Sequence, residues 1–362
     1  MFTERTSVGL DVHARSIQAC AIDTKTGEFT KQRLTPDTRE VIGWLSRLPG
    51  PIAVTYEAGP TGYWLCRDLT AAGLRCEVAA PSKLPRKPGD HVKNDTRDAR
   101  MLAEALHADQ VTSVQVPSVT REDARDLTRA HDDARVELMD ARQRLNAFLL
   151  RRNLVYYGGS RWTGAHHRWI RTHAAQFTGP AAIAFEDYWH TVQTQTARKK
   201  RLATAITRLA ADSEFTTITH RVACLRGIST LTAFALAVEI GDWHRFTGTT
   251  IAAFLGLTPS ENSSGQRTSR GPITRAGNTH ARRLLVEAAW HHTSHYRAGI
   301  TLQRRWETMN DPIVVARAHA GNQRLAHRRA TLTTRGLNPN VINTAIAREL
   351  AGWCWSVATL PG

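Results

Sequence analysis

The 362-residue sequence predicts an α/β domain, then a helical segment, then a mainly helical C-terminal domain. Three observations predict this order. Apolar alternation with period two and helical patterns follow one another through residues 1–118. Near-heptad apolar spacing comes next, and the remainder has helical patterns broken by loops rich in glycine and serine. We expect divisions at 1–118, 119–215, 216–337 and 338–362.

The first domain should contain a mixed sheet covered by helices. Val8, Leu10 and Val12 fall on one face, as in a half-buried strand. Lys25-Thr26-Gly27 predicts a hairpin turn into a third strand. The expected strands are 7–12, 16–23, one from residue 29, 51–56, 74–79 and 111–116, and the expected helices are 36–48, 61–72 and 95–107. Hairpin strands followed by alternating helices and strands give a sheet with helices packed on it.

The middle segment should form long charged helices. Apolar residues recur at spacings of seven, four, three, four and three, at Leu127, Ala134, Leu138, Ala141, Leu145 and Phe148. A second helical pattern covers 185–211, and 156–178 should be an irregular connection with a short helix. Two such helices pair either as an antiparallel hairpin or as an intermolecular coiled coil.

The segment from Cys224 to Phe246 suggests two short helices around Gly227 and again ending near Gly241. Such a pattern resembles a helix–hairpin–helix, whose turn binds DNA backbone through main-chain N–H groups. Ser229 stands where a second glycine is usual. An ordinary helical hairpin is therefore a serious alternative.

The composition favours a polyanionic partner. There are 48 Lys and Arg against 32 Asp and Glu, which gives a net charge of +16 and a pI of about 10.4. A surplus of this size favours nucleic acid over a basic protein with no special partner, because neutralised phosphates release counterions. The five cysteines form no C-x-x-C pair, which argues against a disulfide framework or zinc site. No apolar run approaches a membrane span, so we expect a cytoplasmic protein that works on DNA and does not bind membrane.

Four carboxylates stand where phosphoryl-transfer chemistry needs them. Asp11 lies within the first strand, Glu57 ends a later strand, and Asp95 and Asp98 share one face of a helix start. Hard oxygen ligands of this kind hold Mg²⁺, and two such ions can stabilise the attacking and leaving oxygens of a displacement. Singly, each residue is explained equally well as a solvent-facing, turn or capping residue. Jointly, their order matches the RNase H-like plan, in which the carboxylates meet at one sheet edge.

Residues 255–278 form a loop-rich stretch with glycines, hydroxyls and spaced arginines. Backbone amides and guanidinium groups in such loops are suited to holding phosphates. A serine there becomes a nucleophile if a base or metal assists its deprotonation. Spacing alone favours a linker loop.

At these residues the chain resembles the DEDD transposases of insertion sequences, the group that includes the pilin-gene inverting recombinase and the bridge-RNA-guided recombinases. The resemblance covers almost the whole chain. The N-terminal matches are G-L-D-V at 9–12, Y-E-A-G at 56–59 and K-N-D-T-R-D-A at 93–99, and the C-terminal matches are G-L-T-P-S at 256–260, S-S-G at 263–265 and I-T-R-A-G-N at 273–278. Both sets occur in order and at the separation typical of the family.

The resemblance implies a RuvC-like domain, a coiled-coil segment and a C-terminal transposase domain. It implies that Asp11, Glu57, Asp95 and Asp98 bind Mg²⁺ as an acidic tetrad. It also implies a serine that attacks a DNA phosphate and forms a phosphoserine intermediate; Ser263 is favoured and Ser264 stays open.

The partners implied by the resemblance are donor and target DNA, a structured guide RNA that pairs with both, and further copies of the chain in a dimer or tetramer. The basic residues that we expect to contact nucleic acid are Lys93, Arg267, Arg270, Arg275, Arg282 and Arg283. If the RNA selects the site by base pairing, the protein reads mainly backbone and shape.

Three alternatives compete with this interpretation. A RuvC-like nuclease of the junction-resolvase type would hydrolyse DNA at the metals without serine attack. A binding protein with a decayed site would have no activity, although the intact tetrad argues against it. A metal-independent serine recombinase would not need Mg²⁺, and the sequence shows no matching fold.

Overall fold

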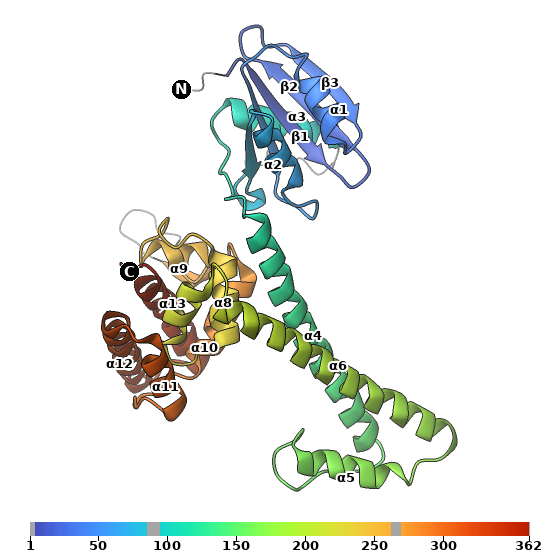
Figure 1. Ribbon diagram of the computed structural model, residues 1–362, viewed down its shortest axis with the longest axis vertical. Coiled ribbons are helices and arrows are strands. Elements are labelled where there is room, and N and C mark those ends of the chain that lie inside the picture. The colour runs from blue at the N-terminus through green and yellow to red at the C-terminus, as the bar shows by residue number, and fades with distance from the viewer. Residues whose placement is uncertain (1–3, 85–94, 262–268, 362) are drawn as a thin grey trace. The chain divides into compact units, whose positions relative to one another are not determined.

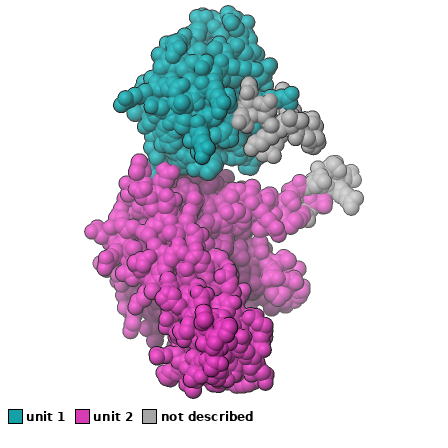
Figure 2. All heavy atoms as spheres, turned by 90° about the vertical axis from the view of Figure 1, so that its right-hand side faces the viewer, with its two compact units in different colours: residues 1–118 teal, residues 119–362 magenta. Residues whose placement is uncertain are grey.

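The computed structural model describes residues 4–84, 95–261 and 269–361. The chain divides into two compact units, residues 1–118 and residues 119–362, which Figure 2 distinguishes by colour. Each unit is described by itself.

Unit 1 contains a five-stranded sheet in the order β3-β2-β1-β4-β5. Its strands are β1 (Thr6–Val12), β2 (Ile17–Asp23), β3 (Phe29–Leu34), β4 (Ile52–Glu57) and β5 (Arg75–Ala79). Strand β2 runs antiparallel to both β1 and β3, whereas β4 is parallel to β1 and β5 is parallel to β4. The predicted mixed sheet is therefore confirmed, and its two parallel connections carry strand ends to one edge.

Helices cover both faces of this sheet (Figure 1). They are α1 (Thr38–Leu45), α2 (Trp64–Ala71) and α3 (Asp95–His107), with a short 3₁₀ turn, η1 (Pro81–Lys83), after β5. Leu10 and Tyr56 are register partners and belong to the same buried cluster as Leu45 of α1 and Leu69 of α2. Strand alternation then turns the neighbouring residue Gly9 to the opposite face, where it contacts α3.

The expected strand at 111–116 is wrong. The structure has only an isolated bridge between Ala79 and Ser113, flanked by hydrogen bonds from Ala80 N to Thr112 O and from Val114 N to Val78 O. The valines of this segment lie at 111, 114 and 116, so they do not keep the strict alternation that a strand edge of full length needs.

Unit 2 begins with a helical hairpin. Helix α4 (Val119–Leu150) pairs with α6 (Gly179–Ala211), and the connection carries the short helix α5 (Gly164–Ala174). Phe148 near the end of α4 packs with Phe185 near the start of α6, at a ring-centroid distance of 6.2 Å. Ala124 near the start of α4 belongs to the same cluster as Ile206 near the end of α6. The two helices are thus antiparallel partners within one chain, and the near-heptad residues lie in their shared core.

The rest of unit 2 is mainly helical, as expected. Its elements are α7 (Thr216–Ala223), α8 (Thr230–Ile240), α9 (Thr250–Phe254), β6 (Pro259–Glu261), β7 (Arg270–Ile273), α10 (Thr279–Ala289), α11 (Ile300–Met309), α12 (Pro312–Thr334) and α13 (Pro339–Ala358). Helix α8 is buried throughout residues 233–240, and the other helices pack around it and one another in a single large core. The small hairpin of β6 and β7 was not expected from the sequence.

The turn between α7 and α8 contains Gly227, whose φ is +83°. A methyl group on Gly227 would overlap the carbonyl oxygen of Ala288 at the end of α10. The turn thus packs against a neighbouring helix, as an ordinary helical hairpin does. In the part of the chain that the structure describes, no helix is both long and apolar enough to cross a membrane.

The contact between Gly9 and α3 yields a stability prediction. In Gly9→Ala, the new methyl group would overlap the carbonyl oxygen of Ala99 and the backbone nitrogen of Ala103. Backbone cannot move aside as a side-chain tip can, so we expect a loss of about 3 kcal/mol in the free energy of unfolding, the upper end for overpacking. Denaturant unfolding followed by circular dichroism measures it.

The matched control is Gly43→Ala in α1, where a methyl group meets no atom within 4 Å among the described residues. Alanine in a helix interior is favoured over glycine by roughly 0.5–1 kcal/mol, so this variant should be unchanged or more stable. Equal stability of the two variants would contradict the close packing of α3 on β1.

Candidate active site

The sheet register brings two of the predicted carboxylates to one edge. Leu10 of β1 pairs with Tyr56 of β4, so Asp11 and Glu57 are the next residues on adjacent parallel strands. Alternation places both on the face opposite Leu10 and Tyr56, which is the face that α3 covers. Asp11 is half-buried and Glu57 is exposed. The Nε2 atom of His13 lies 3.1 Å from Oδ2 of Asp11.

Helix α3 carries the other two predicted carboxylates. It begins at Asp95, and Asp98 lies half-buried in its first turn. Ala99, the next residue, is the one whose carbonyl oxygen touches Gly9. Asp98 is therefore one residue from the helix–strand contact, and Asp11 is two residues from it along β1. Among the described residues, no three His, Cys, Asp or Glu side chains come close enough to hold a metal ion together.

The predicted serines lie outside the described residues, as do Lys93 and Arg267. The structure does show the strands on either side of the serine segment. Pro259 pairs with Ile273 and Glu261 pairs with Arg270, so β6 and β7 form an antiparallel hairpin. The segment 262–268 joins these two strands.

The base of this hairpin is closed by two glycines. Gly256 and Gly277 have φ values of +63° and +69°. A methyl group on Gly256 would overlap the backbone of Ala276, and one on Gly277 would overlap the carbonyl oxygen of Phe254. Because each glycine has both a positive φ and a backbone neighbour in contact, a side chain at either position is excluded.

Hydrogen bonds hold the same two arms together. Arg275 N donates to Gly256 O at 3.1 Å. The guanidinium group of Arg282 donates to Leu255 O at 3.0 Å and to Ala276 O at 2.8 Å, one carbonyl from each arm. Burial lowers the pKa of Arg282 from its usual value, which agrees with its place inside the loop. These hydrogen bonds and the two close glycine contacts hold the arms of the hairpin base together, beside the segment that joins β6 and β7.

The predicted basic contacts have different surroundings. Arg275 has an exposed side chain, whereas Arg282 bridges carbonyls of the hairpin base. Arg283 pairs with Asp132 of α4 at 2.7 Å and with Glu287 at 2.7 Å. Arg282 and Arg283 therefore have roles inside the fold, and their contact with nucleic acid stays a prediction.

A buried carboxylate, which the sequence interpretation missed, lies beside this hairpin. The side chain of Glu239 on α8 has no solvent exposure. It accepts hydrogen bonds from Arg129 Nε at 3.0 Å, Asn278 Nδ2 at 2.6 Å and His280 Nδ1 at 3.1 Å, and it pairs with Arg125 Nε at 3.3 Å. Burial alone would raise the pKa of Glu239, but the hydrogen bonds from His280, Arg129 and Asn278 outweigh it and hold that pKa far below its usual range.

Glu239 joins three segments that are far apart in sequence. Arg125 and Arg129 belong to α4, and Asn278 and His280 lie at the start of α10. Asn278 also caps α10, because its Oδ1 accepts from Ala281 N at 2.9 Å. The residue next to this cap is Gly277 of the hairpin base. The sequence signal was a lone carboxylate in the otherwise uncharged helix L-T-A-F-A-L-A-V-E-I.

Comparison with known proteins gives two family matches. A family described as transposase matches residues 8–153, and a family described as the IS116/IS110/IS902 transposases matches residues 219–303. The first match spans the four predicted carboxylates, and the second spans Glu239 and the β6–β7 hairpin.

Individual proteins that the chain is similar to are also named as transposases. A protein named as a putative transposase, y4qE of Sinorhizobium fredii, is 39% identical over 305 residues, which cover 84% of this chain and 74% of the relative. The transposase for insertion sequence element IS1533 of Leptospira borgpetersenii is 29% identical over 294 residues, 79% of this chain and 84% of the relative. The transposase for IS1111A of Coxiella burnetii is 24% identical over 295 residues, 78% and 76% of the two chains.

The Glu239 cluster predicts a large effect of a small change. Glu239→Gln keeps the shape but removes the charge that two arginines share, so we expect a loss of about 3 kcal/mol in the free energy of unfolding. The control is Glu287→Gln, whose side chain is 53% exposed and pairs with Arg283. An exposed pair contributes at most about 1 kcal/mol. Urea unfolding at neutral pH measures the loss of stability in each variant and should give a much larger loss for Glu239→Gln than for Glu287→Gln.

The pH dependence has a definite sign. The folded-state pKa of Glu239 lies below its ordinary value of 4.5, so its contribution is fully present above that pH and is lost as pH falls through the folded pKa. The stability difference between wild type and Glu239→Gln should therefore be constant from pH 6 to 8, roughly, and narrow below about pH 4.5. A difference that grows on acidification would contradict a charged Glu239.

Proposed function

The chain belongs to the IS116/IS110/IS902 family of transposases, enzymes that cleave and rejoin DNA, and we propose that it does so with a metal-bound acidic tetrad and a nucleophilic serine. Its first unit has the RNase H-like α/β fold that the DEDD domain of the family implies, and its second is mainly helical. The observation that carries the proposal is the placement of Asp11 and Glu57 on adjacent strand ends, on the face covered by the helix of Asp98.

The proposed metal ligands are Asp11, Glu57, Asp95 and Asp98. The family implies a divalent metal ion, and an all-carboxylate donor set on a sheet edge fits Mg²⁺, which prefers hard oxygen ligands. When bound, Mg²⁺ would supply charge stabilisation for the attacking and leaving oxygens. Within the chain, Nε2 of His13 can donate to Oδ2 of Asp11 when it carries the proton, and this contact orients the carboxylate.

The proposed nucleophile is Ser263, with Ser264 as the alternative. The serine Oγ loses its proton and forms a bond to a DNA phosphorus, while the bond from phosphorus to the deoxyribose oxygen breaks and that oxygen takes up a proton. A hydroxyl of the second strand then attacks the phosphoserine, releases the serine and forms the new DNA bond. The rigid base of the β6–β7 hairpin, with Gly256 and Gly277, supports this proposal because a nucleophile must be held in position.

The proposed partners are donor and target DNA and a structured guide RNA. The net charge of +16 supports binding of both nucleic acids. The proposed contacts are Lys93, Arg267, Arg270, Arg275, Arg282 and Arg283. An enzyme with these substrates would work in the cytoplasm, on the nucleoid while it acts.

We further propose that the chain works as a dimer or tetramer through a coiled-coil arrangement of the α4–α6 hairpin. The near-heptad face of α4 packs against α6 of the same chain. Other apolar side chains of the hairpin are exposed to solvent, such as Met139 with 46% and Ile183 with 73% exposure. Light scattering of the chain with bound RNA and DNA, with the mass of the nucleic acids subtracted, should give at least twice the monomer mass of 40.2 kDa. A monomeric complex would contradict the proposal.

The alternative function is a RuvC-like, metal-dependent DNA endonuclease of the junction-resolvase type, in which hydrolysis at the metals replaces serine attack. The tetrad supports both functions equally. Only the product distinguishes them: a nuclease leaves free ends, whereas serine attack leaves a protein–DNA adduct.

The test uses end-labelled donor and target DNA, Mg²⁺ and RNA transcribed from the flanks of the gene, with products separated under denaturing conditions. Wild type should give a denaturant-resistant adduct. Ser263→Ala should lose it, and loss in Ser264→Ala alone would move the role to that residue. Ser269→Ala, an exposed serine of the same stretch, is the matched control and should keep it. Asp11→Asn should lose the adduct but keep DNA binding.

Mg²⁺-dependent cleavage with free ends and no adduct in wild type would support the nuclease instead. Full adduct formation by Asp11→Asn would remove Asp11 from the tetrad. Loss of the adduct in the Ser269→Ala control would show that the assay reports on the loop's fold rather than on the nucleophile.

A further inference from the structure

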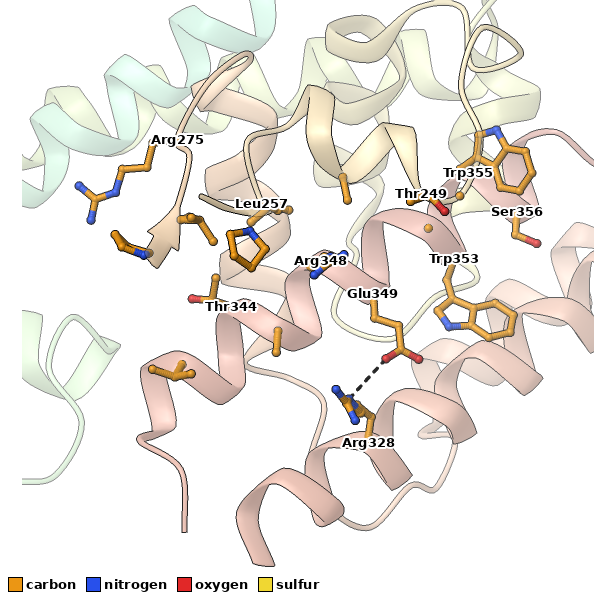
Figure 3. Close-up of a pocket in the computed structure, with 18 of the residues that line it drawn as sticks. Thr249, Leu257, Arg275, Arg328, Thr344, Arg348, Glu349, Trp353, Trp355 and Ser356 are labelled. Atoms are coloured by element: carbon orange, nitrogen blue, oxygen red, sulfur yellow. Dashed lines mark ion pairs between the residues drawn. The ribbon is translucent and has the colours of Figure 1, made fainter. Parts of the chain in front are cut away.

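A pocket of about 980 Å³ lies in unit 2, between the β6–β7 hairpin and helices α12 and α13 (Figure 3). Pro259 and Pro272 of the hairpin line one wall, Arg317 and Arg328 of α12 another, and Arg348 of α13 lies between them. Known ligand pockets range from about 300 to 1,000 Å³, so this volume is at the upper end of that range. The pocket adjoins the strands that flank the proposed catalytic segment.

The residues that line the pocket carry a surplus of positive charge, which favours a negatively charged ligand. Four arginines line it, Arg275, Arg317, Arg328 and Arg348, against one acidic residue, Glu349. Glu349 is already neutralised, because its Oε1 lies 2.9 Å from Nε of Arg324 and its Oε2 lies 3.9 Å from Nε of Arg328.

Three of these cations are exposed and unpaired. In the part of the chain that the structure describes, the side chains of Arg275, Arg317 and Arg348 have no hydrogen-bond or ion-pair partner. Like charges gathered in one concave site repel one another and raise the local concentration of anions. Phosphate groups match a guanidinium fork through two parallel hydrogen bonds.

Two indole rings complete the pocket. Trp353 lies flat on α12, because a methyl group on Gly321 would be only 2.8 Å from its ring atoms Cδ2 and Cε3. Trp355 packs against Gly248 in the same way, with 3.4 Å to Cε3. Both rings are half-buried, so each keeps part of its surface toward the pocket. Aromatic rings beside unpaired cations are the combination that binds nucleic acid through stacked bases and backbone phosphates.

The order of these groups along α12 fits a strand with successive phosphates. Arg317, Gly321, Arg324 and Arg328 are spaced by four, three and four residues, so they share one helix face. Gly321, the residue of α12 against which the Trp353 ring packs, therefore lies between Arg317 and Arg328, which are about 16 Å apart along the helix axis. A base stacked on Trp353 would have an arginine on each side for its flanking phosphates.

We infer that this pocket binds an unpaired segment of the substrate DNA next to the bond that is cut. In a duplex each base is stacked and paired, and only an unpaired strand can offer both a base face to the tryptophans and phosphates to the arginines. The inference rests on the proposed function for its position in the reaction, because the pocket wall is the β6–β7 hairpin. Its binding chemistry stands on the pocket alone.

The experiment measures binding without chemistry. Fluorescence anisotropy is recorded with a labelled single-stranded deoxyoligonucleotide, its duplex and an RNA of the same sequence, without divalent metal and in a Ser263→Ala, Ser264→Ala background. The test variant is Arg317→Ala with Arg348→Ala. The control is Arg208→Ala with Arg297→Ala, two exposed arginines that do not line the pocket.

The test variant should bind single-stranded DNA at least about tenfold more weakly, because two arginines that neutralise phosphates are lost. The slope of log Kd against log salt should fall by about 1.4, since each phosphate contact on a single strand contributes roughly 0.7. Duplex binding should match the control variant. Arg317→Lys with Arg348→Lys keeps the charge and should restore most of the affinity.

Equal losses in test and control variants would overturn the inference, because only total charge would then matter. A larger loss for RNA than for DNA would overturn the assignment to DNA and give the pocket to RNA. Unchanged binding of all three probes would overturn it outright, with the serine proposal intact. Normal pocket binding together with absence of a covalent adduct in the active protein would instead reject the proposed chemistry and leave this site standing.

Discussion

The arrangement of α4, α8 and α10 in unit 2 depends on one buried negative charge. The carboxylate of Glu239 is withdrawn from water and is stable there only because Arg125, Arg129, Asn278 and His280 surround it. These donors come from α4 and from the start of α10, so the three segments must come together for the charge to be tolerated. Hydrophobic packing makes unit 2 compact, but it does not specify this arrangement, because apolar contacts have little directional preference. The hydrogen bonds to Glu239 specify the arrangement, because they are directional.

The same constraint reaches the hairpin that carries the predicted serines. Asn278 serves both Glu239 and the N-terminus of α10, and it directly follows Gly277, whose backbone touches Phe254. The geometry therefore explains the glycines of the motifs G-L-T-P-S and R-A-G-N. The two arms of the hairpin base meet so closely that glycine is required on each, at Gly256 and Gly277. In unit 1, Gly9 plays a similar part, since it lets α3 approach β1 near Asp11. Close backbone contacts therefore lie beside both proposed catalytic elements.

Much of unit 1 could be predicted from the sequence, because its strands alternate and its turns carry the expected residues. The strand expected at 111–116 failed where the valine spacing leaves strict alternation. In unit 2 the helices were expected, and the antiparallel pairing of α4 and α6 was one of the two arrangements considered, but the contacts of the buried charge were not expected. Glu239 lies 110 residues from Arg129, and no local pattern links them. The arginine pocket likewise joins α12, α13 and a hairpin whose two strands are only three and four residues long, too short for alternation to reveal.

The most direct measurement of the central claim is amide hydrogen exchange of wild type and Glu239→Gln. If Glu239 holds the three segments together, the amides of Thr274 and Arg275, which bond to Thr258 and Gly256, should exchange faster in the variant. The amides of Ala281 and of the first half of α4 should change with them, while the sheet of unit 1 should not. Faster exchange confined to α8, or no change at all, would contradict the account and leave the hairpin base independent of the buried charge.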